Sequence, residues 1–174
     1  ATADTNVGTG SLTITLGSYD SGSNTFTNNA DKTPVTINIG TGQQTLEGIR
    51  QAINDSNAGV NASIINDGTG SRLVLTSKDT GAVNGFKLEV ADADGNNTDT
   101  AGLSRLAFDP TAAVGAGKNA SSLQVAQNAN FTINNLPVSK ASNTVTDAVA
   151  GLTLNLKATT TSPINLEVGL DDTA

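Results

Sequence analysis

Short runs in which apolar and polar residues alternate recur along the chain, and they constrain its fold more than any other feature. In "SLTITL", Leu12, Ile14 and Leu16 alternate with Ser and Thr. The same alternation marks "PVTINI", "GVNASIIND", "SRLVLTSKDTG" and "FKLEVAD". Successive side chains of a strand point to opposite faces of its sheet, so each run predicts a half-buried strand. Such alternation is typical of antiparallel sheets with one solvated face.

The segments between these runs predict how the strands connect. "GSYDSGSNTFTNNADK" is rich in Gly and Asn, and we expect it to be a mobile loop between two paired strands. Asp67-Gly68 is a hairpin signal between the next two runs. Leu103, Leu106 and Phe108 end a polar loop, and we expect them to close the base of the domain.

One segment, "TLEGIRQAIND", has helical rather than alternating periodicity. Thr45 is placed to cap its start, and Gly59 to end it in a left-handed conformation. Gly48 costs about 1 kcal/mol relative to Ala inside a helix, so this helix has to be stabilised by packing. Its apolar stripe consists of Leu46, Ile49 and Ile53.

The composition changes after Pro110, where "TAAVGAGKNASS" has the small residues of a connection between domains. A new alternating series follows and predicts about four strands, the last of them over Ile164, Leu166 and Val168. Within it, "VTDAVA" reads as one helical turn capped by Thr144, with Asp147 as its capping-box partner and Gly151 as its stop.

These patterns predict an α+β fold that is predominantly β, with two small domains of mainly antiparallel sheet and one short packing helix in each. The first residues predict either a linker or a first strand of the second domain, and in the latter arrangement the first domain is inserted in the second. The predicted division is 1–10 linker or strand, 11–110 outer domain, 111–122 linker and 123–174 second domain.

Composition argues against several functional classes. The chain has no His and no Cys, which removes the commonest general base, the commonest metal ligand and any thiol nucleophile. Its net charge is -7 and its basic residues are scattered, so we expect no nucleic-acid partner and no membrane partner. No run approaches the roughly 20 apolar residues of a membrane span. The chain contains no Met, and we expect it to be a fragment of a longer protein.

Three motifs suggest chemistry, but each has a simpler interpretation. Gly40 and Gly42 begin a dinucleotide fingerprint, yet Thr45 stands where its third glycine belongs. The loop Asp92–Asp99 is acidic like a calcium loop but lacks the required Gly and Glu spacing. Ser and Lys in "TSKDTG" have nothing to position them as a dyad. We therefore expect no enzyme activity and no cofactor, and we assign no catalytic, cofactor-binding or metal-ligating residue.

Two long segments point to a family. "TLEGIRQAINDSNAGVNASIINDGTGSRLVLTSKDTGAVNGFKLEV" resembles the outer domain of flagellar filament-capping proteins, the FliD or hook-associated protein 2 family, and its core, up to "RLVLTSKDTG", is similar to their flagellin IN type of segment. "AQNANFTINNLPVSKASNTVTDAVAGLTLNLKATTTSPINLEV" resembles the next domain of the same proteins. The order of the segments also agrees. The chain therefore looks like the head of such a protein, without its helical leg domain.

The resemblance implies a function. Family members are exported through the flagellar channel, assemble as a ring-like cap at the extracellular filament tip and help flagellin subunits to insert. Flagellin and further copies of the same protein are the implied partners. A surface adhesin that binds host mucin or glycans is the alternative. For either role, the loops Gly17–Lys32 and Asp92–Asp99 are where we expect exposed, strain-specific surface.

Overall fold

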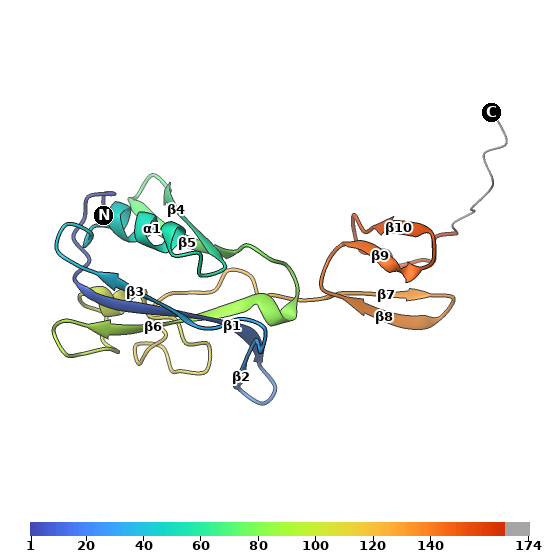
Figure 1. The fold of residues 1–174 in the computed structure, drawn as a ribbon, viewed down its shortest axis with the longest axis horizontal. Helices are drawn as coiled ribbons and strands as arrows, with labels where there is room; N and C mark the ends of the chain where they lie inside the picture. The colour runs from blue at the N-terminus through green and yellow to red at the C-terminus, as the bar shows by residue number, and fades with distance from the viewer. Residues whose placement is uncertain (166–174) are drawn as a thin grey trace. The chain divides into compact units, whose positions relative to one another are not determined.

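The computed structural model describes residues 1–165, which fall into two compact units, residues 1–141 and the chain from Ser142 onward. Strands dominate both units, and the strands within each unit pair antiparallel (Figure 1). The elements of the first unit are β1 Gly10–Asp20, β2 Thr25–Asn28, β3 Val35–Ile39, α1 Leu46–Asp55, β4 Val60–Asn66, β5 Ser71–Ser77, η1 Ala82–Asn84, β6 Gly85–Asp92, η2 Leu103–Leu106, β7 Ala129–Ile133 and β8 Leu136–Lys140. Those of the second are β9 Thr144–Val149 and β10 Leu152–Asn155.

The long strand β1 organises the main sheet. It pairs with β6 along one edge, and along the other with β3 over its first half and β2 over its second. Leu12 lies between Ile37 of β3 and Val90 of β6 in this register. The predicted pairing of the first two alternating runs is therefore confirmed. The loop prediction between them is wrong in part, because Tyr19 and Phe26 extend the ladder into β2.

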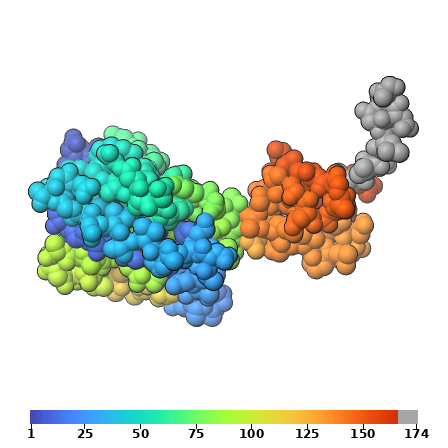
Figure 2. Space-filling model, in the orientation of Figure 1, coloured from blue at the N-terminus to red at the C-terminus, as the bar shows by residue number. Residues whose placement is uncertain are grey.

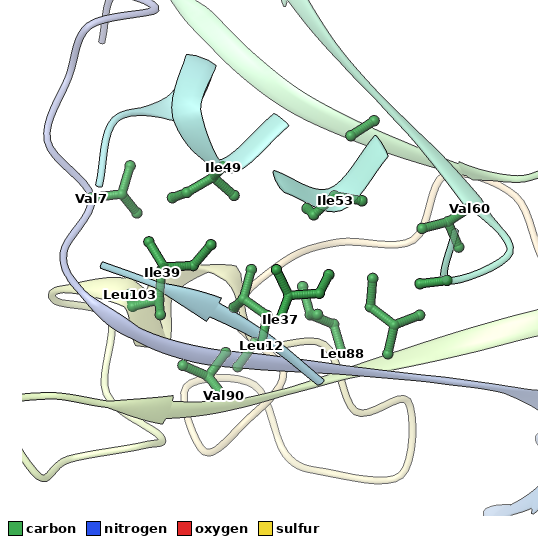
Figure 3. Packing of buried hydrophobic residues seen from close by; sticks show 14 of the residues in the cluster. Val7, Leu12, Ile37, Ile39, Ile49, Ile53, Val60, Leu88, Val90 and Leu103 are labelled. Atoms are coloured by element: carbon green, nitrogen blue, oxygen red, sulfur yellow. The ribbon is translucent and has the colours of Figure 1, made fainter. Parts of the chain in front are cut away.

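The hydrophobic core lies between the main sheet and α1. Ile49 and Ile53 of the helix are fully buried and face β3 across the core (Figure 3). The fully buried side chains of this two-layer core are aliphatic, and Phe86 and Phe108 pack against them in partly buried positions. The larger cluster residues include Val7, Leu12, Ile14, Leu16, Ile37, Ile39, Val60, Leu88, Val90 and Leu103.

The helix begins as predicted but ends earlier. Thr45 is the N-cap, and its hydroxyl accepts a hydrogen bond from the Gly48 N–H at 3.1 Å. At the other end, Ser56 is the C-cap and Asn57 takes the left-handed conformation, with φ of 54°. Gly59 also has positive φ, but it lies beyond the helix and leads into β4. The prediction that Gly59 ends the helix is therefore wrong, since Asn tolerates the left-handed cap as well.

Gly48 has a steric role that the sequence does not reveal. A Cβ at this position would lie 2.6 Å from the backbone oxygen of Gln43. The glycine therefore allows the turn before α1 to pack against the first turn of the helix.

The hairpin β4–β5 pairs as expected, with Ala62 opposite Leu75 and the turn at Asp67-Gly68. The free edge of β4 is covered by a side chain of α1. Asn54 donates to the Ala62 carbonyl at 2.9 Å and accepts from the Ala62 N–H at 2.8 Å. This pair of hydrogen bonds replaces a neighbouring strand and ties the hairpin to the helix.

The second predicted helix is wrong, because "VTDAVA" forms strand β9 and pairs with β10. Val145 lies opposite Leu154 in this pair, and Thr144 bonds to the Asn155 side chain instead of capping a helix. Gly151 has φ of 78° and serves the turn between the two strands. β-branched Thr and Val favour a strand, and the cross-strand partners outweigh the weak capping signal. The predominantly β α+β fold class is nevertheless confirmed, with α1 the one α-helix among residues 1–165.

Part of the last predicted strand can be placed. Ile164 is exposed and outside any strand. Leu166 and Val168 lie outside the described residues.

Candidate interaction surface

The start of α1, where a glycine-rich turn suggested a phosphate loop, is engaged by the chain's own first residues. The Leu46 N–H donates to the Thr5 carbonyl at 3.3 Å, and the Glu47 N–H donates to the Ala3 carbonyl at 3.1 Å. The next N–H of the helix bonds to the Thr45 hydroxyl. Phosphate binding at a helix N-terminus uses these same free N–H groups. Here they are already satisfied within the chain.

The first candidate loop, Gly17–Lys32, is a structured hairpin. Tyr19 lies opposite Phe26 in the β1–β2 pair, and its hydroxyl donates to the Asn24 side chain at 2.9 Å. Asn24 in turn donates to the Thr111 carbonyl at 3.2 Å. The hairpin is therefore tied to a segment 87 residues further along the chain.

The tip of this hairpin presents a carboxylate to solvent. The Ser23 hydroxyl donates to Asp20 at 2.6 Å and the Gly22 N–H donates to it at 2.9 Å. These hydrogen bonds, the one from Ser23 first, hold the pKa of Asp20 below its ordinary value. Residues 20–25 are exposed and lie on the surface visible in Figure 2. The tip is thus a rigid, negatively charged projection.

The second candidate loop, Asp92–Asp99, turns its first carboxylate inward. The N–H and hydroxyl of the fully buried Ser104 donate to Asp92 at 2.9 and 3.1 Å. Burial raises the pKa of Asp92, but the hydrogen bonds from the N–H groups of Ser104 and Asp94 outweigh it, so the pKa is lowered overall. The Asp92 N–H donates a hydrogen bond to the Asn97 side-chain oxygen. The first acidic residue of the calcium-like motif therefore holds the base of the loop.

Asn119 ties this loop to the segment 111–122, which the sequence predicted as a linker. Its side-chain nitrogen donates to the carbonyls of Thr98 at 3.2 Å and Ser104 at 2.8 Å, and its backbone N–H donates to the Ala107 carbonyl at 2.9 Å. Both candidate loops thus depend on this segment. Sequence reasoning missed this role, because one Asn among small residues gives no signal of a partner 15 or more positions away.

Large apolar side chains are exposed within that segment, just after it and on the hairpins. Leu123 is 90% exposed and Val114 is 86% exposed, although the sequence placed Leu123 at the start of a domain. Leu136, in β8, is 68% exposed. Ile65 contributes a smaller apolar area on β4. These side chains, with the two candidate loops, make up the surface available for protein contacts.

Within residues 1–165, no three His, Cys, Asp or Glu side chains gather closely enough to hold a metal ion. The same residues include no helix of the length and apolar character needed to cross a membrane.

Two families match separate parts of this surface and core. The flagellin hook IN motif matches residues 25–79, which run from β2 to just beyond β5. The C-terminal region of flagellar hook-associated protein 2 matches residues 126–174, which include β7 to β10. Together the two segments define a class, that of the flagellar hook-associated proteins.

Curated relatives narrow this class. The B-type flagellar hook-associated protein 2 of Pseudomonas aeruginosa is 43% identical over 142 residues, covering 78% of this chain and 30% of the relative. Flagellar hook-associated protein 2 of Escherichia coli K12 is 42% identical over 125 residues, covering 71% of this chain and 25% of the relative. The chain thus spans less than a third of the length of these relatives.

Solved structures agree with the relatives. FliD (HAP2) from P. aeruginosa PAO1 has 35% identity and a TM-score of 0.72, covering 98% of this chain and 70% of that one. The D2-D3 domains of the flagellar cap protein FliD from E. coli have 36% identity and the same TM-score, covering 92% of this chain and 71% of that one. The chain belongs to the FliD, or hook-associated protein 2, family.

Proposed function

We propose that this chain is the head region of a filament-capping protein that acts outside the cell at the tip of the bacterial flagellum. In the full-length protein, copies associate into a ring-like cap that promotes flagellin insertion and polymerisation. The observation that carries this proposal is the match to FliD from P. aeruginosa over 98% of the chain. The relatives are named for the flagellar hook and cap, and none of the names given above suggests adhesion.

The architecture suits a mechanical role. A cap has to keep its shape while unfolded flagellin passes and folds beneath it, which requires a rigid scaffold and no reaction chemistry. The main sheet and α1 supply a buried aliphatic core, and Asn54 and Asn119 fasten the hairpin β4–β5 and the loop Asp92–Asp99 to it. We assign no catalytic role to any residue of the chain.

The test is an in-frame deletion of this region from the full-length gene in its own bacterium. We expect short or missing filaments and unpolymerised flagellin in the medium, measured by electron microscopy and by immunoblotting of the culture supernatant. Restoring the region should restore the filaments. Filaments of normal length with a loss of attachment alone would instead favour the adhesin alternative, including contact with host mucin or glycans.

The two loops allow a finer test of what the surface does. We propose that Gly17–Lys32 and Asp92–Asp99 carry strain-specific surface, since the first presents a charged tip and the second an exposed acidic turn. Exchanging both loops for those of a relative should change antibody recognition while leaving polymerisation intact. Unchanged recognition would contradict this part of the proposal.

A further inference from the structure

The turn between β5 and β6 makes hydrogen bonds to both ends of the hairpin β7–β8. The Thr80 hydroxyl donates to the Ala141 carbonyl at 2.7 Å, just after β8. The Ala82 N–H donates to the Asn128 side-chain oxygen at 2.8 Å, just before β7. These contacts join segments 61 and 46 residues apart in the sequence.

Each side of this contact is held in place by its own hydrogen bonds. In the turn, the Asn84 side chain donates to the Thr80 carbonyl at 2.7 Å, and the Asn84 N–H donates to the Gly81 carbonyl at 3.0 Å. On the hairpin, the Asn128 side-chain nitrogen donates to the Ser139 hydroxyl at 3.2 Å. Hydrogen bonds within each side therefore order both surfaces before they make contact, so the contact itself costs little side-chain entropy.

The two surfaces also fit closely. Gly81 has φ of 99°, a conformation that favours glycine, and an added Cβ would lie 2.6 Å from the Ala141 Cβ. A Cβ on Gly85 would lie 3.4 Å from the Ala126 Cβ. The turn and the start of β6 can approach the residues on either side of the hairpin this closely because both positions lack a side chain.

The covalent connection between the main sheet and the hairpin does not impose this arrangement. Residues 121–125 form no helix or strand, and Leu123 within them is 90% exposed. Within this stretch, the hydrogen bond from Ser122 to Gln124 is local and gives no anchor to the sheet. The orientation of the hairpin therefore depends on the contacts at the turn.

We propose that Thr80, Gly81, Ala82, Asn128 and Ala141 form a latch that holds the hairpin β7–β8 in one orientation relative to the main sheet. When the latch is closed, residues 1–141 move as one body. When it opens, the connection at residues 121–125 acts as a hinge, while the main sheet and its core stay folded. The latch is thus a conformational device that sets how stiffly the two parts are joined.

Spin-label distances test the latch directly. The chain has no Cys, so the substitutions Asn61→Cys and Thr132→Cys, both at exposed positions, provide a unique pair of labels on β4 and β7. In this background, Thr80→Val with Asn128→Ala removes the two latch hydrogen bonds, and Thr80→Val does so with little change in volume. We expect the width of the distance distribution, measured by pulsed electron spin resonance, to increase at least about twofold, as for release of a hinge.

The matched control is Thr76→Val with Asn130→Ala, the same two changes at exposed positions outside the latch. It should leave the width unchanged. An equal width in the latch variant and the wild type would overturn the proposal, as would equal broadening in the control.

Amide hydrogen exchange gives a second measurement that a global loss of folding would not mimic. In Asn128→Ala, the Ala82 amide loses its acceptor and should exchange at least about tenfold faster. The Leu12 amide, in the centre of the main sheet, should keep its wild-type rate. An unchanged rate at Ala82 would contradict the latch, and equal acceleration at both amides would show unfolding instead.

Discussion

The region from Val7 to Ala107 and the two hairpins after it share one sequence pattern but differ sharply in burial. The first region contains a continuous cluster of buried aliphatic side chains. In the hairpins β7–β8 and β9–β10, Val145 is the one buried hydrophobic residue among the described positions. Alternation thus predicts that a strand forms, but not how deeply its apolar face is buried.

The difference arises from the number of layers. The main sheet has α1 as a second layer, so its inward side chains lose their water on all sides. A two-stranded hairpin has a single narrow face and is marginally stable by itself in water. On β7–β8, Phe131 and Val138 lie opposite each other and are only half-buried. The hairpin β7–β8 therefore depends on specific tertiary contacts, such as the latch, more than on a core of its own.

The largest expected effect compares the same substitution in both regions. Leu12 is 0% exposed and Leu136 is 68% exposed. The same Leu→Ala substitution at the two positions therefore shows the effect of burial on the free energy of unfolding. Leu12→Ala should lower the free energy of unfolding by about 3 kcal/mol, because it removes buried methyl groups and leaves a cavity. Leu136→Ala should change it by less than about 0.5 kcal/mol. Urea denaturation followed by circular dichroism measures both, and equal losses would contradict the contrast.

A second comparison concerns two glycines of the turn and helix. Gly48→Ala should lower the free energy of unfolding by about 1–2 kcal/mol, because the clash with Gln43 exceeds the gain in helix propensity. Gly40→Ala has no atom within 4 Å of the new Cβ and should be neutral within about 0.5 kcal/mol. Thermal and urea unfolding distinguish the two. A stabilising Gly48→Ala would show that the turn relaxes without cost.

The helix cap provides a smaller test of how the second layer is held. Thr45→Ala removes the acceptor for the Gly48 N–H and should cost about 1 kcal/mol of unfolding free energy. Thr45→Ser keeps the hydroxyl and should recover most of this loss. Urea midpoints of the three proteins provide the measurement, and equal values for the Ala and Ser variants would rule out capping as the cause.

The smallest expected effect is pH-dependent and tests the base of the loop Asp92–Asp99. The pKa of Asp92 is lower in the folded protein than its ordinary value of 3.8, so the unfolded chain binds more protons near that pH. The carboxylate's contribution is therefore present above about pH 4 and is lost as the pH falls through the folded pKa. Urea midpoints measured from pH 6 to pH 2 should show the difference between wild type and Asp92→Asn shrinking in this window.

Asp4→Asn is the control for this prediction, because it removes the same charge from an exposed side chain. An equal decrease for Asp4→Asn would show an effect of net charge instead of the contacts of Asp92. A pH-independent difference for Asp92→Asn would contradict a role of the ionised carboxylate.

Much of the fold can be predicted because its signals are local. The alternation in "SLTITL", the apolar stripe of α1 and the Asp67-Gly68 turn each depend on residues a few positions apart, and all three are confirmed. The prediction of a helix at Thr144 also rests on a local signal, and it is wrong. A short capping signal is local too, but strand pairing between Val145 and Leu154 decided the outcome.

The candidate surface was predictable only in outline. The sequence indicated the two loops, because Gly, Asn and Asp gather in them, but it gave no sign that Asn119 fastens one of them. By itself, the sequence determined α1, the alternating strands of the first unit and the family, since periodicity and motif are properties of neighbouring residues. Tertiary structure alone decided which alternating runs became core, which glycines permit close contact and which hydrogen bonds fix the hairpin. Those outcomes depend on contacts between atoms of residues that are tens of positions apart in the sequence. Burial and the fit of side-chain shapes decide such contacts, and local sequence pattern does not.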